Sequence, residues 1–320
     1  MAKGTQTPMN TCQSIRLDGS GGRAGPQQQS AGTWVQLNWE DRDDRAWLED
    51  QAELDELVVD SLLAEDTRPR VVEHENGLLL ILRGVNLNAG RRPEDMISLR
   101  LWFDGERLIS TSRLSLRTVA DIVERLDGGT GPTSLSELLL ELIEGLTDRV
   151  DELIESLEEE IDELEASLLE GAERGLRSHI GQVRRTIIVI RRYLAPERDA
   201  LVRLSSMNRP LLADLDRGRI REQADALTRL VEDLDMARER GAMIHEQLLT
   251  RLSDQLNTRM YLLSIVAAVF LPLGFITGLF GINVGGMPWV ETNLGFWWVT
   301  LLVAIIAGGL GVWLKRRRWL

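Results

Sequence analysis

The 320-residue sequence has few of the residue types that build covalent or metal-bound frameworks. It contains one cysteine, Cys12, which excludes a disulfide within the chain and a cysteine-based metal site. The three histidines, His74, His179 and His245, are far apart, so each is expected to be solvated or locally paired. Basic residues are outnumbered, 37 Lys and Arg against 50 Asp and Glu, which argues against nucleic acid as a partner.

Motifs of enzymes are missing as well. The segment "GGTGPTSLSELL" lacks the Lys-Ser/Thr pair of a phosphate-binding Walker loop. It predicts instead a break followed by a helix start, with Ser134 or Ser136 as the N-cap. The chain shows no nucleophile–base pattern and no metal-protease helix, so an enzyme is not expected. No apolar run lies near the N-terminus, and a secretory signal peptide is not expected.

Charge is absent from a long stretch near the C-terminus. Residues 260–290 carry no charged side chain, and the run 260–280 would cross the roughly 30 Å of a bilayer core as a helix. A second apolar run follows at 296–314. Tryptophans gather at the ends of the runs, as interfacial anchors do: Trp289, Trp297, Trp298, Trp313 and Trp319. The sequence predicts two transmembrane helices; a buried hairpin of a soluble protein is the alternative.

The charges that flank these runs predict their orientation. The connecting loop, residues 281–295, has no Lys or Arg and only Glu291 as a charged residue. The tail 315–320 begins with "KRRR". Cytoplasmic segments next to a membrane are enriched in Lys and Arg. We therefore expect the loop outside and both termini in the cytoplasm, in the inner membrane of a bacterial cell.

Composition divides the rest of the chain into three parts. Residues 1–32 are rich in Gly, Gln and Ser, contain no aromatic residue, and are predicted to be disordered. Residues 33–127 predict a cytosolic α/β domain with hairpin turns at Asn76-Gly77 and Asp104-Gly105. Residues 128–259 predict a cytosolic stalk of long helices. The expected fold class is thus an α+β domain followed by long helices and two C-terminal transmembrane helices.

The predicted stalk has two notable features. Residues 137–170 hold 14 acidic residues and one basic residue, Arg149. Such a face is ordinarily solvated; the alternative is a surface whose negative potential concentrates divalent cations. Pro196 is expected to kink or break a helix over 175–206. From 219 the apolar pattern runs without a break into the first membrane run, which predicts one helix of about 60 residues, about 90 Å long.

The order of these features resembles the CorA superfamily of divalent-cation transporters. The first predicted span ends in Gly281-Ile282-Asn283, which is similar to the Gly-Met-Asn signature of that superfamily. Followed by "VGGMPW", it resembles the ZntB branch, which is associated with zinc; Met287 and Trp289 depart from the usual loop. Segments such as "TRPRVVEHENGLLLILRGVNLN" and "RRYLAPERDAL" also resemble this branch, so the likeness covers about residues 33–320.

The resemblance implies a funnel-shaped homopentamer in a lipid bilayer, whose five first spans line one axial pore. One stripe of that span would form the pore wall: Met260, Leu263, Ala267, Leu271, Gly274 and Gly278. A packing face of small residues is the alternative, and around a symmetry axis both can hold. Gly281, Ile282 and Asn283 would form the outer selectivity filter. The outer loop would include Gly285, Gly286, Met287, Pro288 and Glu291.

The filter chemistry suits a hydrated ion. Divalent cations hold water tightly, and a ring of neutral amide oxygens can hydrogen-bond the hydration shell and still release the ion. The alternative is that Gly281 only caps the helix and Asn283 only forms a turn. No Cys or His lies in either span, so zinc, and its coupling to protons, are implied by the resemblance alone. No bound cofactor is implied.

Two other functions stay open at this point. One keeps the same fold and is a CorA-like Mg²⁺ or Co²⁺ channel gated by intracellular metal. The second function is of a different kind: a membrane-anchored coiled-coil scaffold or sensor that transports nothing. The Gly281-Ile282-Asn283 motif and the uncharged stripe argue against the scaffold, because an anchor needs neither.

Overall fold

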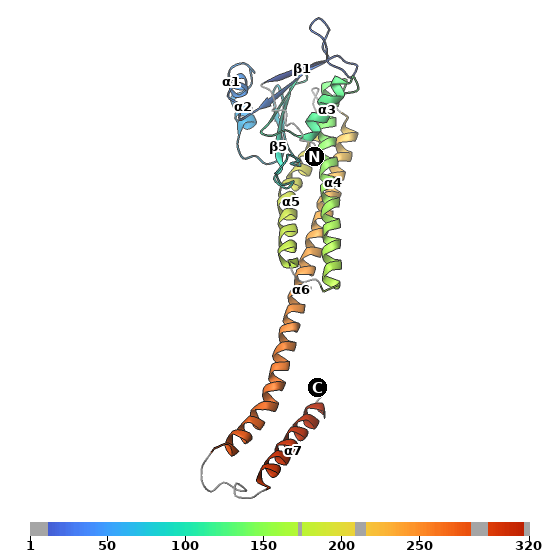
Figure 1. The fold of residues 1–320 in the computed structure, drawn as a ribbon. Helices are drawn as coiled ribbons and strands as arrows, with labels where there is room; N and C mark the ends of the chain where they lie inside the picture. The colour runs from blue at the N-terminus through green and yellow to red at the C-terminus, as the bar shows by residue number, and fades with distance from the viewer. Residues whose placement is uncertain (1–11, 172–174, 209–215, 283–293, 317–320) are drawn as a thin grey trace. The chain divides into compact units, whose positions relative to one another are not determined.

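A computed structural model describes residues 12–171, 175–208, 216–282 and 294–316. The chain divides into two compact units, Met1–His245 and Glu246–Leu320. Helix α6 belongs to both, and each unit is described below by itself (Figure 1).

The first unit is built on a six-stranded mixed sheet. Its strands follow the order β1-β2-β6-β5-β4-β3. All neighbouring pairs are antiparallel except β2 and β6, which are parallel. The strands are β1 Gln13–Leu17, β2 Gly32–Asn38, β3 Arg70–His74, β4 Gly77–Gly84, β5 Ile97–Phe103 and β6 Arg107–Ser112.

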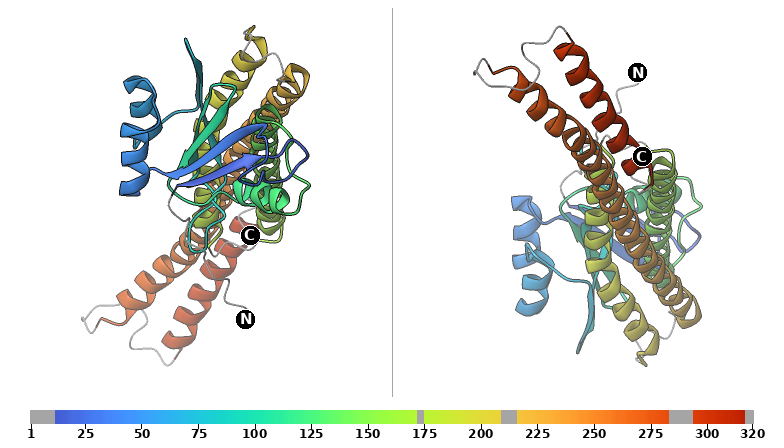
Figure 2. Two further views of the ribbon diagram at one scale, coloured as in Figure 1. Left: turned by 90° about the horizontal axis from the view of Figure 1, so that it is seen from above. Right: turned by 90° about the horizontal axis from the view of Figure 1, so that it is seen from below.

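Helices cover both faces of this sheet. Every residue of β4, "GLLLILRG", is buried, and its nearly continuous apolar sequence is typical of a strand enclosed on both sides. Helices α1 (Arg42–Asp50) and α2 (Glu56–Leu63) lie on one face, as the blue helices of Figures 1 and 2 show. Their side chains share a core with one face of the strands: Val35, Leu37, Leu48, Val58, Leu62, Leu79, Ile81, Trp102 and Ile109.

The other face is covered by long helices. These are α3 (Arg117–Asp127), α4 (Leu135–Leu169), α5 (Leu176–Ser206) and the first part of α6 (Arg217–Phe280). The Ser134 hydroxyl accepts a hydrogen bond from the Glu137 N–H at 3.2 Å, which confirms the predicted N-cap. Gly84 lets α4 approach the sheet closely, because a Cβ at this position would lie 2.6 Å from the Leu146 side chain.

Ion pairs join the three long helices across their polar edges. Arg219 of α6 binds Glu144 of α4 at 2.6 Å, and Arg191 of α5 binds Asp235 of α6 at 2.7 Å. Figure 2 shows α6 passing between α4 and α5 in this unit. The predicted single helix into the membrane run is confirmed, since α6 has 64 residues and would be about 96 Å long. Helix α5 continues through Pro196, so of the predicted kink or break the break is wrong.

Three sequence-based boundaries need correction. Disorder over residues 1–32 is wrong for 12–32, where β1 pairs with β2 and buries Ile15 and Leu17. Low aromatic content hid this strand, whose two apolar residues alternate as a half-buried strand requires. The boundary at 127/128 separates no compact units, because α4 and α5 pack on the sheet. The first hairpin turns one residue earlier than predicted, since His74 pairs with Gly77.

Candidate functional site

Two helices of the second unit carry the apolar runs predicted to cross a membrane. The C-terminal part of α6 and the whole of α7 (Gly295–Arg316) are long enough and apolar enough to do so. In the most apolar window of each helix, 0% of α6 and 6% of α7 is buried inside the protein. An exposed apolar surface of this size needs a non-aqueous neighbour, and a buried soluble hairpin does not fit it.

Each of these helices has one partly covered face. Helix α7 runs back alongside the end of α6 in Figures 1 and 2. On α6 the less exposed side chains recur every three or four residues: Ile265, Val269, Leu273, Ile276 and Phe280. The corresponding set on α7 is Val299, Val303, Ile306, Leu310 and Leu314. This pattern is the one that two helices leave when each packs one face against the other.

The predicted pore stripe lies on a different face of α6. All six of its residues are exposed in the single chain: Met260, Leu263, Ala267, Leu271, Gly274 and Gly278. Ala267 and Ile265 are two residues apart, which places them about 200° apart around a helix. The stripe is therefore turned away from the face that is partly covered, and its residues are exposed in the part of the chain that the structure describes.

The glycines of this stripe have no local reason to be small. Among the described residues, no heavy atom beyond the helix backbone and the adjoining residues lies within 4 Å of the position where a Cβ would stand on Gly274 or Gly278. Glycine in the middle of a helix costs about 1 kcal/mol relative to alanine. The described residues do not account for two glycines here, whereas a close neighbouring helix or a passage along the helix surface would.

Helix α6 ends where the sequence motif begins. The Gly281 N–H bonds to the carbonyl oxygens of Thr277 at 3.0 Å and Gly278 at 3.1 Å, and Ile282 is exposed. Gly281 does not have the positive φ of a left-handed helix cap, so its backbone conformation does not itself require glycine. The other predicted mouth and loop residues lie outside the described residues: Asn283, Gly285, Gly286, Met287, Pro288 and Glu291.

The described part of the two spans offers no ligand set for a dehydrated metal. From Met260 to Ile282 and from Gly295 to Leu314 there is no charged side chain, no cysteine and no histidine. Among the described residues of the whole chain, no group of three His, Cys, Asp or Glu side chains could hold a metal ion. An ion that follows this surface would keep much of its water, because only hydroxyls and backbone oxygens are available to it.

The acidic face of α4 is partly neutralised by arginines from neighbouring helices. Glu141 binds Arg125 of α3, and Glu144 binds Arg219 of α6. Further along the helix, Arg240 contacts both Asp162 and Glu165. These pairs tie the bundle together, so only part of this face remains available to attract cations.

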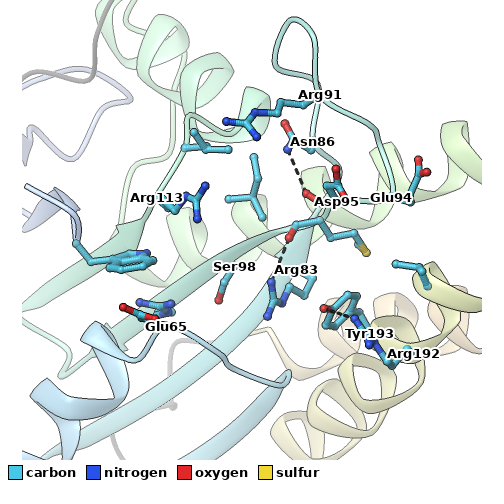
Figure 3. A pocket seen from close by; sticks show the side chains of 16 residues that line it. Glu65, Arg83, Asn86, Arg91, Glu94, Asp95, Ser98, Arg113, Arg192 and Tyr193 are labelled. Carbon is cyan, nitrogen blue, oxygen red and sulfur yellow. Dashed lines mark hydrogen bonds between the residues drawn. The ribbon is translucent and has the colours of Figure 1, made fainter. Parts of the chain in front are cut away.

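Sequence analysis missed an arginine-lined pocket in the first unit. Arg83 on β4 and Arg100 on β5 are buried, and both line it (Figure 3). The available signal was a charged residue inside each of two otherwise apolar strand runs, because a charge in a covered strand is costly without a purpose or a partner. Glu197 of α5 is buried beside Arg83, and its carboxylate accepts a hydrogen bond from the Arg83 backbone N–H at 3.2 Å.

The fold and this surface define a class of protein. It is a membrane protein with an α/β/α unit, a long helix that continues into a first span, and an uncharged face with small residues on that span. The chain belongs to the CorA-like Mg²⁺ transporter protein family, whose sequence pattern matches residues 29–316.

Individual relatives agree with the family. The chain is 36% identical to the zinc transport protein ZntB of Yersinia enterocolitica over 96% of its own length and 95% of the relative. It is 40% identical to the divalent cation transporter CmaX of Pseudomonas aeruginosa over 86% of its length and 84% of that protein. The solved structure of full-length CmaX is 38% identical, covers 96% of this chain and 97% of its own, and has a TM-score of 0.82.

The comparisons settle two of the predictions made from sequence. The resemblance to the CorA superfamily and its ZntB branch is confirmed, and so is the fold class. A protein of this family is a transporter of divalent metal ions and not an enzyme. This also excludes the alternative of a membrane-anchored scaffold that transports nothing. The metal, the number of subunits and the orientation are matters of proposal.

Proposed function

We propose that this protein takes up Zn²⁺ across a bacterial inner membrane through an axial pore formed by five copies of the chain. The first spans, residues 260–280, surround the pore, and the second spans, residues 296–314, face the lipid. The loop 281–295 lies outside, and both termini lie in the cytoplasm. The basic residues Lys315 and Arg316 at the end of α7 support this orientation.

The observation that carries the proposal is the uncovered stripe on α6. Its six residues are exposed in the single chain. No described neighbour lies within 4 Å of a Cβ placed on either of its two glycines, so no contact within the described chain explains their small size. Helices packed around a symmetry axis would cover the flanks of this face and leave its centre as the wall of a passage. The side chains of the stripe become smaller from Met260 and Leu263 to Gly274 and Gly278. The passage is therefore widest toward the outer mouth.

At the mouth, Gly281, Ile282 and Asn283 form the selectivity filter. Five copies of the Asn283 amide give a ring of neutral oxygens that hydrogen-bond the water around the ion. Neutral groups bind weakly enough for the ion to leave, as conduction requires. Glu291 and the loop residues Gly285, Gly286, Met287 and Pro288 line the approach, where the only carboxylate of the loop attracts cations.

Zinc is favoured because a relative that spans nearly the whole chain is named a zinc transport protein. The alternative is a Mg²⁺ or Co²⁺ channel gated by intracellular metal. It is favoured by the absence of Cys and His from the described spans, since Mg²⁺ is the ion that most resists losing its water. Uptake coupled to protons needs a titrating group outside the hydrocarbon, because the described spans contain none.

Ion flux into proteoliposomes tests the proposal. The full-length protein is reconstituted with a metal-sensitive dye inside, and Zn²⁺ or Mg²⁺ is added outside, with and without an inward proton gradient. We expect Zn²⁺ entry that is faster with the gradient and absent from protein-free liposomes. Magnesium entry that ignores pH and is inhibited by internal Mg²⁺ would replace the proposal with the alternative.

A further inference from the structure

A cavity of about 340 Å³ lies in the first unit, far in sequence from the membrane spans. It is bounded by the ends of β4 and β5, by the connection between them, and by α5 (Figure 3). Sites for small molecules typically have volumes of about 300–1,000 Å³. The cavity is thus large enough for a ligand of several heavy atoms.

Its lining is positively charged although the chain as a whole carries a net charge of −13. Five arginines line it, namely Arg83, Arg91, Arg100, Arg113 and Arg192. Three carboxylates also line it, Glu65, Glu94 and Asp95. Glu94 lies 3.8 Å from Arg92, which is not part of the lining, so its charge is partly met from outside.

The two deepest arginines are buried, and the carboxyl groups of Asp66 and Glu197 act on the Arg83 charge only from beyond ion-pair distance. Arg83 is 8% exposed and Arg100 is 1% exposed, and no described carboxylate oxygen lies within 4 Å of either guanidinium group. Their donors go to backbone carbonyl oxygens: Arg83 to Met96 at 3.1 Å and Arg100 to Leu62 at 2.7 Å. The Nε atom of each is buried and has no hydrogen-bond partner among the described residues.

Burial of two like charges has an electrostatic consequence. Desolvation, together with the nearby Arg83 charge, lowers the pKa of Arg100 to about 10. A buried charge is costly unless a partner of opposite sign offsets the loss of water. The described residues supply aromatic rings instead, since Arg83 lies 4.4 Å from the centre of Tyr193 and Arg100 lies 4.8 Å from that of Trp39. Neither guanidinium group thus has a close partner of opposite charge among the described residues.

The outer arginines are placed to hold an anion. The Arg91 side chain makes no ion pair with any described residue, and Arg113 reaches only Glu40, at 3.5 Å. Arg192 donates to the Tyr193 hydroxyl at 2.6 Å and lies over the same ring as Arg83. In Figure 3, Arg91 and Arg113 stand on one side of the pocket, and Tyr193 and Arg192 stand on the other.

We propose that this pocket binds a small anion that carries more than one phosphate group. Guanidinium groups match phosphate oxygens with two parallel hydrogen bonds each, and they are strongest when little water competes. Because arginines stand on both sides of the cavity, an anion with two charged groups can be held at both ends. The site is separate from the proposed pore and does not depend on which metal is carried.

Inorganic pyrophosphate is the probe that tests this pocket. Calorimetric titration is done on the full-length protein in detergent, at constant ionic strength and with EDTA, because pyrophosphate also binds free metal ions. We expect saturable binding of one pyrophosphate per chain, which sulfate at the same ionic strength does not reproduce. The proposal would be overturned if no saturable binding appeared up to about 10 mM pyrophosphate. A dissociation constant above this concentration corresponds to a binding free energy weaker than about 3 kcal/mol.

Variants locate the binding in the pocket. We expect Arg91→Gln and Arg192→Gln each to weaken pyrophosphate binding about tenfold, the effect of removing one hydrogen bond to a charged group. The matched control is Arg185→Gln, which removes the same charge from an exposed position of α5 that lies outside the lining. It should change the affinity by less than about twofold.

Two outcomes of the variant series would refute the assignment. If Arg185→Gln weakens binding as much as Arg192→Gln does, the effect is one of general surface charge. If pyrophosphate does not bind the wild type and both pocket variants lower the native mass of the assembly, the arginines contact a neighbouring copy of the chain. The native mass of each variant is therefore measured alongside the titration.

Discussion

Single side chains decide what the proposed outer mouth offers to a hydrated cation. Gly281 closes the last turn of α6 through its N–H, and the next polar side chain along the sequence is Asn283. An amide oxygen at this position can contact the hydration shell of an ion without carrying a charge that would hold it. The side chain is therefore the sharpest single test of the filter.

We expect Asn283→Ala to abolish or strongly reduce metal flux while expression and oligomer mass stay nearly unchanged. Hydrogen bonds to a charged partner contribute about 1.5–3 kcal/mol each, and five copies would be lost together. Flux into proteoliposomes and native mass measure the two effects. Asn293→Ala, the same change later in the loop, is the control. A destabilised oligomer with flux reduced only in proportion would make Asn283 a turn former.

Glu197 is a second residue whose environment has a measurable consequence. It is buried on α5, and burial raises the pKa of its carboxyl to about 8, although the Arg83 backbone N–H and the Arg83 charge act in the opposite direction. Between about pH 4.5 and pH 8 the folded protein therefore holds a proton that the unfolded chain releases. Unfolding releases a proton in this window, so stability falls as the pH rises.

We expect Glu197→Gln to remove this part of the pH dependence. Glutamine keeps an oxygen that can accept from the Arg83 N–H but does not titrate. Across this window, the free energy of unfolding of the wild type should fall by up to about 1.4 kcal/mol per pH unit relative to that of the variant. Thermal unfolding of both proteins in detergent at pH 5.5 and pH 8 measures the difference. Equal shifts in the two proteins would show that Glu197 does not titrate there.

At the scale of the secondary-structure element, the two ends of α6 differ in how far their apolar residues are buried. Up to Ile244 most of its apolar residues are buried within the first unit, and from Leu256 on most of them are exposed. One helix thus joins a soluble bundle to a membrane span without a loop.

Bulk on the α6 stripe should block transport, whereas the same bulk on α7 should not. Gly274 and Gly309 both have no neighbour within 4 Å in the single chain. Leucine is a better helix former than glycine, so neither Gly274→Leu nor Gly309→Leu should weaken its own helix. We expect flux to be lost only in Gly274→Leu, measured in proteoliposomes. Loss in both variants would indicate that the two glycines serve helix packing alike.

At the scale of the whole molecule, the first prediction concerns assembly. An exposed apolar stripe on the long helix leaves a single chain incomplete, and helices in lipid associate through small residues. We expect the detergent-solubilised protein to have the native mass of five chains of 36.0 kDa each. Native mass spectrometry under gentle conditions measures it. A mass of one or two chains would contradict the pentamer.

The second whole-molecule prediction concerns orientation. Gly286→Cys, in a Cys12→Ser background, should react with a membrane-impermeant thiol reagent in intact cells. Leu320→Cys in the same background should react only after the cells are permeabilised, since the basic tail is expected in the cytoplasm. The opposite labelling pattern would invert the proposed topology.

Local patterns in the sequence determined the helices of this protein and its family. The continuous helix α6, the Ser134 cap and the two apolar spans were predictable because each depends on residues a few positions apart. Absence of charge marked the spans, and absence of cysteine and histidine marked the kind of ion chemistry they can offer. The motif 281–283, together with its place at the end of a span, was enough to indicate the CorA superfamily.

Only the tertiary structure decided which of these residues meet. Strand β1 is too short and too poor in aromatic residues to be recognised alone, and it is stabilised by pairing with β2. Arg83 and Arg100 come from different strands, and Tyr193 comes from a helix more than 90 residues further on. Their meeting in one pocket depends on strand register and helix packing, which are set by contacts distant in sequence. The uncovered stripe on α6 likewise became visible only when the face toward α7 was known.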